Sequence, residues 1–202
     1  FPTRRSSDLP FLKDHGFKTP KFAIIEQESD ILKFFEECEG DIMLKPIHSS
    51  GSKGVSHITD AQNIKEAFQE ALKYSQGMHL IAEQFIQRKG HQIAGDAFVI
   101  DGDIAFWGLA NEHFDDTCNP LVPIGESFPV DLSTELNQKA KREIQRAINV
   151  LGYRNGAINL DFIFDGNDDV WIIELGPRNG GNLITDAIRL ANGVDLAEYT
   201  VR

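Results

Sequence analysis

Residues 156–178 determine the fold class, and they read GAINLDFIFDGNDDVWIIELGPR. Apolar side chains recur at every second position in residues 156–164 and again in residues 170–175, which predicts two β-strands. The stretch between them, residues 165–169, is made of aspartate, glycine and asparagine and is typical of a turn. The sequence therefore predicts an antiparallel hairpin.

Each strand of this hairpin carries one carboxylate, Asp161 on the first strand and Glu174 on the second. Pairing Asp165 with Val170 places Asp161 directly opposite Glu174, with Cβ atoms about 4.5–5.5 Å apart. A register shifted by one residue would send the two side chains to opposite faces. Two carboxylates this close repel, so one is expected to hold a proton unless a cation lies between them. Such oxygen ligands suit Mg²⁺, and a solvated strand face carrying two charges is the alternative.

The rest of the chain mixes hairpins with helices, which predicts an α+β protein rather than a doubly wound parallel sheet. Helices are expected after Ser29, from Thr59 and after Ser133, where a polar residue precedes apolar residues at helical spacing. Residues 111–131 contain three prolines and no regular period, so we expect a long loop there. Further strands are expected at residues 21–25, 41–46, 55–58, 79–86, 91–100 and 104–110.

The composition excludes several classes of protein. The chain has 202 residues, and its 31 acidic against 20 basic residues give a formal net charge of −11. Nucleic-acid binding depends on Lys and Arg, so no nucleic-acid partner is expected. No apolar run approaches the ~18–20 residues of a membrane helix, so no membrane association is expected. Cys38 and Cys118 are far apart in the sequence, which favours two free thiols in a reducing cytoplasm.

A loop rich in glycine and serine, residues 48–54 with the sequence HSSGSKG, follows Lys45 and Pro46. It fits neither of the two common glycine-rich phosphate motifs. Glycine frees its backbone N–H groups, and together with Lys45 and Lys53 the loop can close over phosphate oxygens. A solvent-exposed Ser/Gly turn is the alternative interpretation.

Arg178 stands just beyond the second strand of the C-terminal hairpin, directly after Pro177. An arginine in this position is poorly explained as a surface residue. Its planar fork of donors matches carboxylate or phosphate oxygens, and the nearby Gly180 and Gly181 let backbone approach a ligand. These features predict that Arg178 binds a ligand.

Taken together, these segments resemble the ATP-grasp family of carboxylate–amine and related ligases. The resemblance runs from about Phe22 to Val194 and rests on MLKP at residues 43–46, AEQFI at 82–86, and GAINLD at 156–161 with IELGPR at 173–178. It implies an α+β ATP-grasp fold in which two subdomains grip ATP between them. Residues 12–86 would form the lid subdomain with the glycine-rich hairpin, and residues 87–202 a truncated C-terminal catalytic subdomain. Residues 1–11 are expected to be an unstructured or non-native lead-in, and the chain to be a fragment.

The resemblance also implies which residues contact ATP. Lys45 would contact the phosphates, the glycine-rich loop would close over them, and residues 83–86 would form the hinge that recognises adenine, largely through backbone groups. A glutamate that many members place near the ribose is replaced here by Gln92. The implied nucleotide contacts are Lys45, Ser50, Gly51, Ser52, Lys53, Gly54, Glu83, Gln84, Phe85, Ile86 and Gln92.

For the metal, the resemblance implies that Asp161 and Glu174 hold Mg²⁺, with Mn²⁺ as an alternative, against the β- and γ-phosphates. Many members have an asparagine as a further ligand where this chain has Gly176, so Asn179 or Asn182 is the candidate substitute. Arg178, with Lys45, is the expected catalytic residue and would steady the acyl phosphate or the substrate carboxylate.

The expected activity is that of an ATP-dependent ligase that joins a carboxylate to an amine through an acyl phosphate and releases ADP and phosphate. A bicarbonate-activating carboxylase type, linked to biotin or purines, and a non-catalytic ATP-binding module are the alternatives. The expected partners are small-molecule carboxylate and amine substrates, in a full-length parent that can form a homo-oligomer. His113 lies among Asn111, Glu112, Asp115 and Asp116, where a metal cluster is the alternative to a solvated loop facing the substrate.

Overall fold

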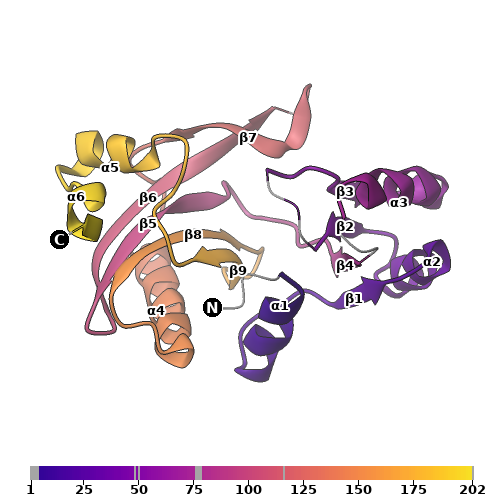
Figure 1. Cartoon of the computed structure of the whole chain (residues 1–202), viewed down its shortest axis with the longest axis horizontal. Coiled ribbons are helices and arrows are strands. Elements are labelled where there is room, and N and C mark those ends of the chain that lie inside the picture. Colours follow the sequence, from indigo (N-terminus) through magenta and orange to yellow (C-terminus); the bar gives the residue numbers. More distant parts are fainter. Residues whose placement is uncertain (1–4, 48, 50, 76–78, 116, 202) are drawn as a thin grey trace. The chain divides into compact units, whose positions relative to one another are not determined.

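The computed structural model describes residues 5–47, 49, 51–75, 79–115 and 117–201. The chain divides into two compact units (Figure 1). The N-terminal unit consists of residues 2–86 with residues 115–122, and the C-terminal unit of residues 87–114 with residues 123–202. Each unit is built around an antiparallel sheet with helices, so the predicted α+β class is confirmed.

The N-terminal unit contains a four-stranded sheet in the order β1-β4-β2-β3. Every pairing in this sheet is antiparallel. Three helices and one 3₁₀ turn accompany the sheet. The elements are α1 (Arg5–Asp14), β1 (Phe22–Ile25), α2 (Glu28–Glu37), β2 (Ile42–Pro46), β3 (Ser56–Ile58), the 3₁₀ turn Ala61–Asn63, α3 (Ile64–Lys73) and β4 (Leu80–Gln84).

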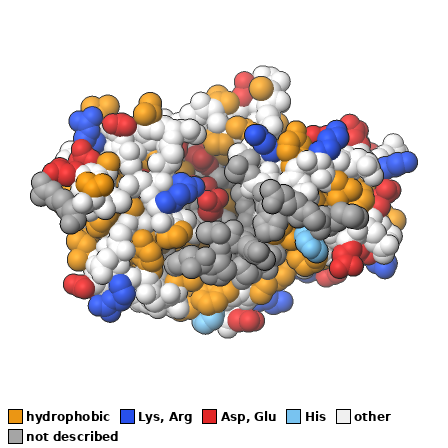
Figure 2. All heavy atoms as spheres, in the orientation of Figure 1, with side chains coloured by type: hydrophobic (Ala, Val, Ile, Leu, Met, Phe, Trp, Pro, Cys, Tyr) orange, Lys and Arg blue, Asp and Glu red, His pale blue; other side chains and the backbone are white. Residues whose placement is uncertain are grey.

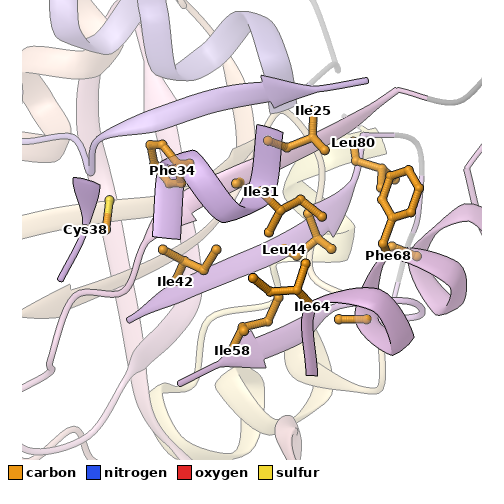
Figure 3. Close-up of a cluster of buried hydrophobic side chains, with 13 residues drawn as sticks. Ile25, Ile31, Phe34, Cys38, Ile42, Leu44, Ile58, Ile64, Phe68 and Leu80 are labelled. Atoms are coloured by element: carbon orange, nitrogen blue, oxygen red, sulfur yellow. The ribbon is translucent and has the colours of Figure 1, made fainter. Parts of the chain in front are cut away.

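Alternation along the strands decides which face of this sheet is buried. In β2, Ile42 and Leu44 are fully buried, whereas Met43 and Lys45 between them are only partly buried. The buried face packs with α2 and α3, and Figure 3 shows the cluster with isoleucines from both strands and helices. Its free thiol, Cys38, is buried there, and Cys118 is a free, exposed thiol. The opposite face is therefore where Lys45 lies.

Residues 5–11 of the expected lead-in are helical, as part of α1, so they are not unstructured; that residues 1–11 are non-native stays a prediction. The helix ends at Asp14, two residues before Gly16, which has φ +72°. The Gly16 N–H donates to the Lys13 carbonyl and the Phe17 N–H to the Leu12 carbonyl, both at 3.0 Å. Leu12 and Phe17 are both buried, so packing as well as hydrogen bonding holds this helix end.

The C-terminal unit contains a five-stranded sheet in the order β7-β6-β5-β8-β9. The predicted hairpins β5–β6 and β8–β9 are both present. The elements are β5 (Ile93–Ile100), β6 (Asp103–Asp115), β7 (Asn119–Ser127), α4 (Thr134–Leu151), β8 (Gly156–Phe164), β9 (Val170–Gly176), α5 (Ile184–Asn192) and α6 (Leu196–Val201).

The prediction of a long loop over residues 111–131 is wrong. Strand β6 continues to Asp115, and β7 occupies Asn119–Ser127. β7 is the edge strand of the sheet, so one of its sides has no partner strand. Proline is tolerated there, because the N–H that it lacks would have no partner on the open side. Pro120 and Pro123 were therefore a misleading signal against a strand.

The two faces of the C-terminal sheet have different covers (Figure 1). Helix α4 covers one face, where the Trp107 indole N–H donates to Asn137 of α4 at 2.8 Å and the Trp107 ring stacks near Phe162. Helices α5 and α6 lie on the other face, where Tyr199 of α6 meets the Phe98 ring. We call this second face the polar face. The strand registers place five polar side chains on this face, Gln92, Asp96, Glu112, Asn159 and Asp161.

Among the described residues, no helix combines the length and the apolar character that crossing a membrane requires. On the described part of the surface in Figure 2, acidic and basic side chains are interspersed, and the basic ones do not form a continuous patch.

Candidate active site

The two hairpin carboxylates lie directly opposite each other, as predicted, although the strand pairing near the turn differs from the predicted one. Near the turn Phe164 pairs with Val170, one residue away from the predicted pairing of Asp165. The register then shifts between Asp161 and Phe162, where β9 contains one extra residue, and Asp161 pairs with Glu174. Without this bulge the two side chains would lie on opposite faces of the sheet.

The surroundings of Asp161 strongly favour its protonated form. Burial, together with the negative charges of Glu112, Glu174 and Glu126, raises the pKa of Asp161 from 3.8 to about 8. Arg178 acts in the opposite direction and lowers the pKa. This carboxyl therefore holds a proton near neutral pH in the nucleotide-free chain, as the sequence predicts for a pair without a cation.

Sequence analysis did not place Glu112 or Glu126 beside Asp161; it named Glu112 only as part of a loop around His113, and it did not name Glu126. Glu112 lies on β6, two residues beyond Ala110, which shares a row of the sheet with Asp161. Ser127 contacts Asn111 and His113, so alternation places Glu126 on the same face as Glu112. A sequence signal existed, because alternation continues past Ala110, but the expected loop concealed it.

Gln92 lies on the polar face beside Glu112. Its carbonyl accepts the Glu112 N–H at 2.9 Å, and its side chain hydrogen-bonds the Glu112 carboxyl group. The expected ribose contact of Gln92 stays a prediction. The contacts described here show that Gln92 positions Glu112.

Asp96 anchors the loop that carries Arg178, and sequence analysis did not identify it. It is fully buried, and both of its carboxylate oxygens lie 2.9 Å from the Gly180 N–H. Asn159 donates to Asp96 at 3.1 Å. A Cβ atom at Gly180 would lie 2.9 Å from the Asp96 carboxylate, so only glycine fits this close approach. Residues 177–182 are thus held against the polar face.

Arg178 lies close to the metal-ligand candidates. Its guanidinium is 3.4 Å from Glu174 and also donates to the Asn179 carbonyl at 3.0 Å. The Asn179 side chain donates to Thr200 of α6 at 2.9 Å, while its Oδ1 is buried without a hydrogen-bond partner among the described atoms. Asn179 as a metal ligand stays a prediction.

In the N-terminal unit, the structure joins two of the predicted nucleotide contacts. Lys45 Nζ lies 2.5 Å from Glu83 Oε2, across the β2–β4 pair. Both side chains are mostly shielded from solvent, which strengthens the attraction between their charges. The pair keeps the Lys45 ammonium on the sheet face opposite the hydrophobic core.

The predicted hinge, residues 83–86, comprises the last two residues of β4 and the two residues after it. The Gln84 N–H donates to the Lys21 carbonyl at 2.8 Å and the Phe85 N–H to the Asp41 carbonyl at 3.1 Å. The Phe85 ring stacks on His57, with ring centroids 4.1 Å apart. The hinge backbone is therefore held at two successive residues before Ile86.

The glycine-rich loop has the backbone that the sequence predicts. Gly51 and Gly54 have φ of +63° and +71°, in the left-handed region that favours glycine. The Ser52 hydroxyl donates to the Leu121 carbonyl at 2.9 Å, and Lys53 is exposed. Ser50 lies outside the described residues.

The donor set on the polar face fits a hard divalent cation. Asp161 and Glu174 supply adjacent carboxylates, and the neighbouring negative charges that raise the pKa of Asp161 favour a positive charge there. Within the described part of the chain, no group of three or more His, Cys, Asp or Glu side chains is arranged to hold a metal. Mg²⁺ suits such a site, because it is bound by one or two carboxylates and takes its remaining ligands from phosphates and water.

Comparison with known proteins gives the same family as the motifs. The family model of the ATP-grasp domain matches residues 10–190. A D-alanine–D-alanine ligase of Cupriavidus pinatubonensis is 24% identical over 200 residues, covering 93% of this chain and 58% of its own length. The chain thus spans somewhat more than half the length of this curated relative.

Solved structures show the same fold. An L-amino acid ligase from Bacillus licheniformis matches with a TM-score of 0.79 at 20% identity, over 98% of this chain and 46% of its own. A biotin carboxylase from Campylobacter jejuni matches with a TM-score of 0.81 at 17% identity, over 97% and 44%. The fold is therefore shared by enzymes with different substrates.

Proposed function

The chain belongs to the ATP-grasp family, and from this premise we propose that it is the nucleotide-binding part of an ATP-dependent ligase joining a carboxylate to an amine. The observation that carries the proposal is the pairing of Asp161 with Glu174 across the bulge, beside Arg178. It brings two acids and one guanidinium to one end of the polar face, as binding of a metal–triphosphate requires.

Each group has a role set by its charge. Mg²⁺, held by Asp161 and Glu174, would neutralise charge on the β- and γ-phosphates. Lys45 contributes a further positive charge to the phosphates, and the freed N–H groups of the glycine-rich loop donate to their oxygens. Arg178 binds the carboxylate or acyl phosphate through its planar fork of donors.

The proposed reaction proceeds by activation of the carboxylate. A carboxylate oxygen of the substrate attacks the γ-phosphorus, the bond to the β-phosphate oxygen breaks, and ADP leaves. The amine nitrogen then attacks the acyl carbon, phosphate leaves, and the amine loses a proton as the amide forms. No covalent bond to the protein is needed, so the chain contributes positioning and electrostatic stabilisation.

Calorimetric titration with ATP, with and without Mg²⁺, tests the nucleotide site. We expect Mg²⁺-dependent binding that Glu174→Gln weakens by roughly 10- to 150-fold, because an interaction with a charged group contributes about 1.5–3 kcal/mol. Asp101→Asn is the matched control, since Asp101 lies on the β5–β6 turn with an exposed side chain. Equal affinities of Glu174→Gln and wild type would refute the metal assignment.

An ADP-release screen of the full-length parent tests the reaction. Carboxylate–amine pairs should stimulate ADP release, and bicarbonate should not replace the carboxylate. Release that depends on bicarbonate would instead identify a carboxylase-type enzyme, and tight nucleotide binding without release a non-catalytic module.

A further inference from the structure

Two acidic side chains on the polar face have no part in the proposed handling of ATP. Glu112 on β6 and Glu126 on β7 are separated from the Asp161–Glu174 pair by strand β5. Their charges still reach it, since both raise the pKa of Asp161. The polar face therefore carries two more carboxylates than the Mg²⁺ site uses.

Glu112 has an unusual combination of burial and missing contacts. Only 6% of it is exposed, yet its Oε2 has no hydrogen-bond partner among the described atoms. A buried oxygen acceptor without a donor destabilises the folded chain, and more so when it is charged. Such destabilisation is typical of a group whose partner is a ligand.

The neighbours of Glu112 show what that ligand must carry. Burial and the charge of Glu126 raise the pKa of Glu112 to about 7, while the Gln92 side chain and Arg88 act in the opposite direction. Burial and the charge of Asp96 raise the pKa of Glu126 as well. The Arg88 guanidinium is engaged over the Phe114 ring, 4.7 Å from its centroid. A hydrogen-bond donor with a positive charge would satisfy the orphaned oxygen and stabilise both carboxylates.

An ammonium group meets this requirement better than a second metal ion. It is satisfied by two or three oxygen acceptors and has N–H donors for them. Mg²⁺ bound by two carboxylates takes further ligands from the phosphates, which the proposed function places at the Asp161–Glu174 pair and not at Glu112. The nitrogen of the ammonium group attacks the acyl phosphate once the ammonium has passed one proton to a carboxylate, and it loses a second proton as the amide forms.

We propose that Glu112, with Glu126 beside it, binds the positively charged amino group of the amine substrate. The substrate class is then a primary ammonium compound, such as an amino acid, rather than a neutral amine or an anion. This inference rests on the proposed ligase function, because it concerns the second substrate of that reaction.

The test uses L-alaninamide, a small primary ammonium compound, and L-lactamide, which has a neutral hydroxyl in place of the ammonium. Binding of each to the chain is measured by NMR titration at pH 7, with and without saturating Mg²⁺ and a non-hydrolysable ATP analogue. We expect saturable binding of L-alaninamide and at least tenfold weaker binding of L-lactamide. Glu112→Gln should weaken L-alaninamide binding at least tenfold. The matched control Glu135→Gln, on the exposed surface of α4, should leave it unchanged.

Several outcomes would overturn the inference. These are equal binding of the two amides, no binding of L-alaninamide, unchanged binding to Glu112→Gln, and stoichiometric displacement of L-alaninamide by added Mg²⁺. Glu112→Gln removes a buried charge without changing shape, so its melting temperature should not fall. Binding of the non-hydrolysable ATP analogue is measured separately from binding of the amides. If the analogue does not bind, the proposed nucleotide site is refuted. The titrations without nucleotide would still decide whether Glu112 binds an ammonium group.

Discussion

Replacing Asp161 with asparagine should stabilise the nucleotide-free chain, and more so at higher pH. Asn has the shape of the protonated acid but never ionises. In the wild type, burial and the neighbouring carboxylates raise the pKa of Asp161 from 3.8 to about 8. Between those pH values, folding must keep a proton on this group that the unfolded chain has released, so wild-type stability falls as pH rises.

The size of the effect follows from the shift. Each pH unit between the two pKa values changes the free energy of unfolding by up to about 1.36 kcal/mol. From pH 5 to pH 8, the advantage of Asp161→Asn should therefore grow by up to about 4 kcal/mol. About 2 kcal/mol remains if Glu112 shares the proton with Asp161. For a chain of this size, 2 kcal/mol corresponds to roughly 4–8 °C in melting temperature.

Thermal unfolding at pH 5, 6, 7 and 8 measures this gap for Asp161→Asn and for Asp101→Asn, the exposed control. Asn also suits the positive φ of 53° at position 101. Added Mg·ATP should raise the melting temperature of the wild type and of the control, but not that of Asp161→Asn. A gap that does not depend on pH, or a lower melting temperature of Asp161→Asn at pH 8, would refute the electrostatic argument.

Three further changes test other parts of the site. Gly180→Ala should lower the free energy of unfolding by about 1–3 kcal/mol in urea titrations. The reason is that its Cβ atom would lie 2.9 Å from the Asp96 carboxylate. Gly181→Ala, with open space around it, should leave the free energy of unfolding unchanged. Arg178→Lys should slow substrate-dependent ADP release of the full-length parent by about 10- to 100-fold, since the planar fork is lost; an unchanged rate would remove Arg178 from the reaction. Lys45→Met should weaken ATP binding in calorimetry. It should also lower the free energy of unfolding by about 1–3 kcal/mol, because the shielded Glu83 carboxylate loses its ion-pair partner. An unchanged ATP affinity together with an unchanged free energy of unfolding would exclude the proposed role of Lys45 in binding phosphate.

Local patterns were sufficient for most of the secondary structure and for the family. The alternation in residues 156–164 and 170–175 predicted the C-terminal hairpin, and Ser133 before apolar residues at helical spacing predicted the start of α4. These features depend only on residues close together in the sequence, where side-chain spacing and backbone preference act directly. Strand β7 was missed for the same reason. Local proline content predicts a loop, while only its place at the sheet edge makes those prolines acceptable.

The composition of the site was determined by the sequence only in part. Motifs predicted Lys45, Asp161, Glu174 and Arg178, since each stands in one of three short patterns, MLKP, GAINLD and IELGPR. That Asp161 faces Glu174 was decided by a bulge, whose extra residue in β9 corrects a register that otherwise separates them. Strand pairing depends on the packing of the whole sheet, so turn chemistry alone does not determine it.

Tertiary structure alone decided which residues surround Asp161 and Glu174. Glu112 and Glu126 lie far from Asp161 in the sequence, and their charges act on it because β6 and β7 belong to the same sheet as β8. Their burial, and with it the raised pKa of Asp161, is a property of the assembled sheet. Residue types and their spacing are written in the chain, whereas the proximity of charges in a medium of low polarity exists only once the strands have paired.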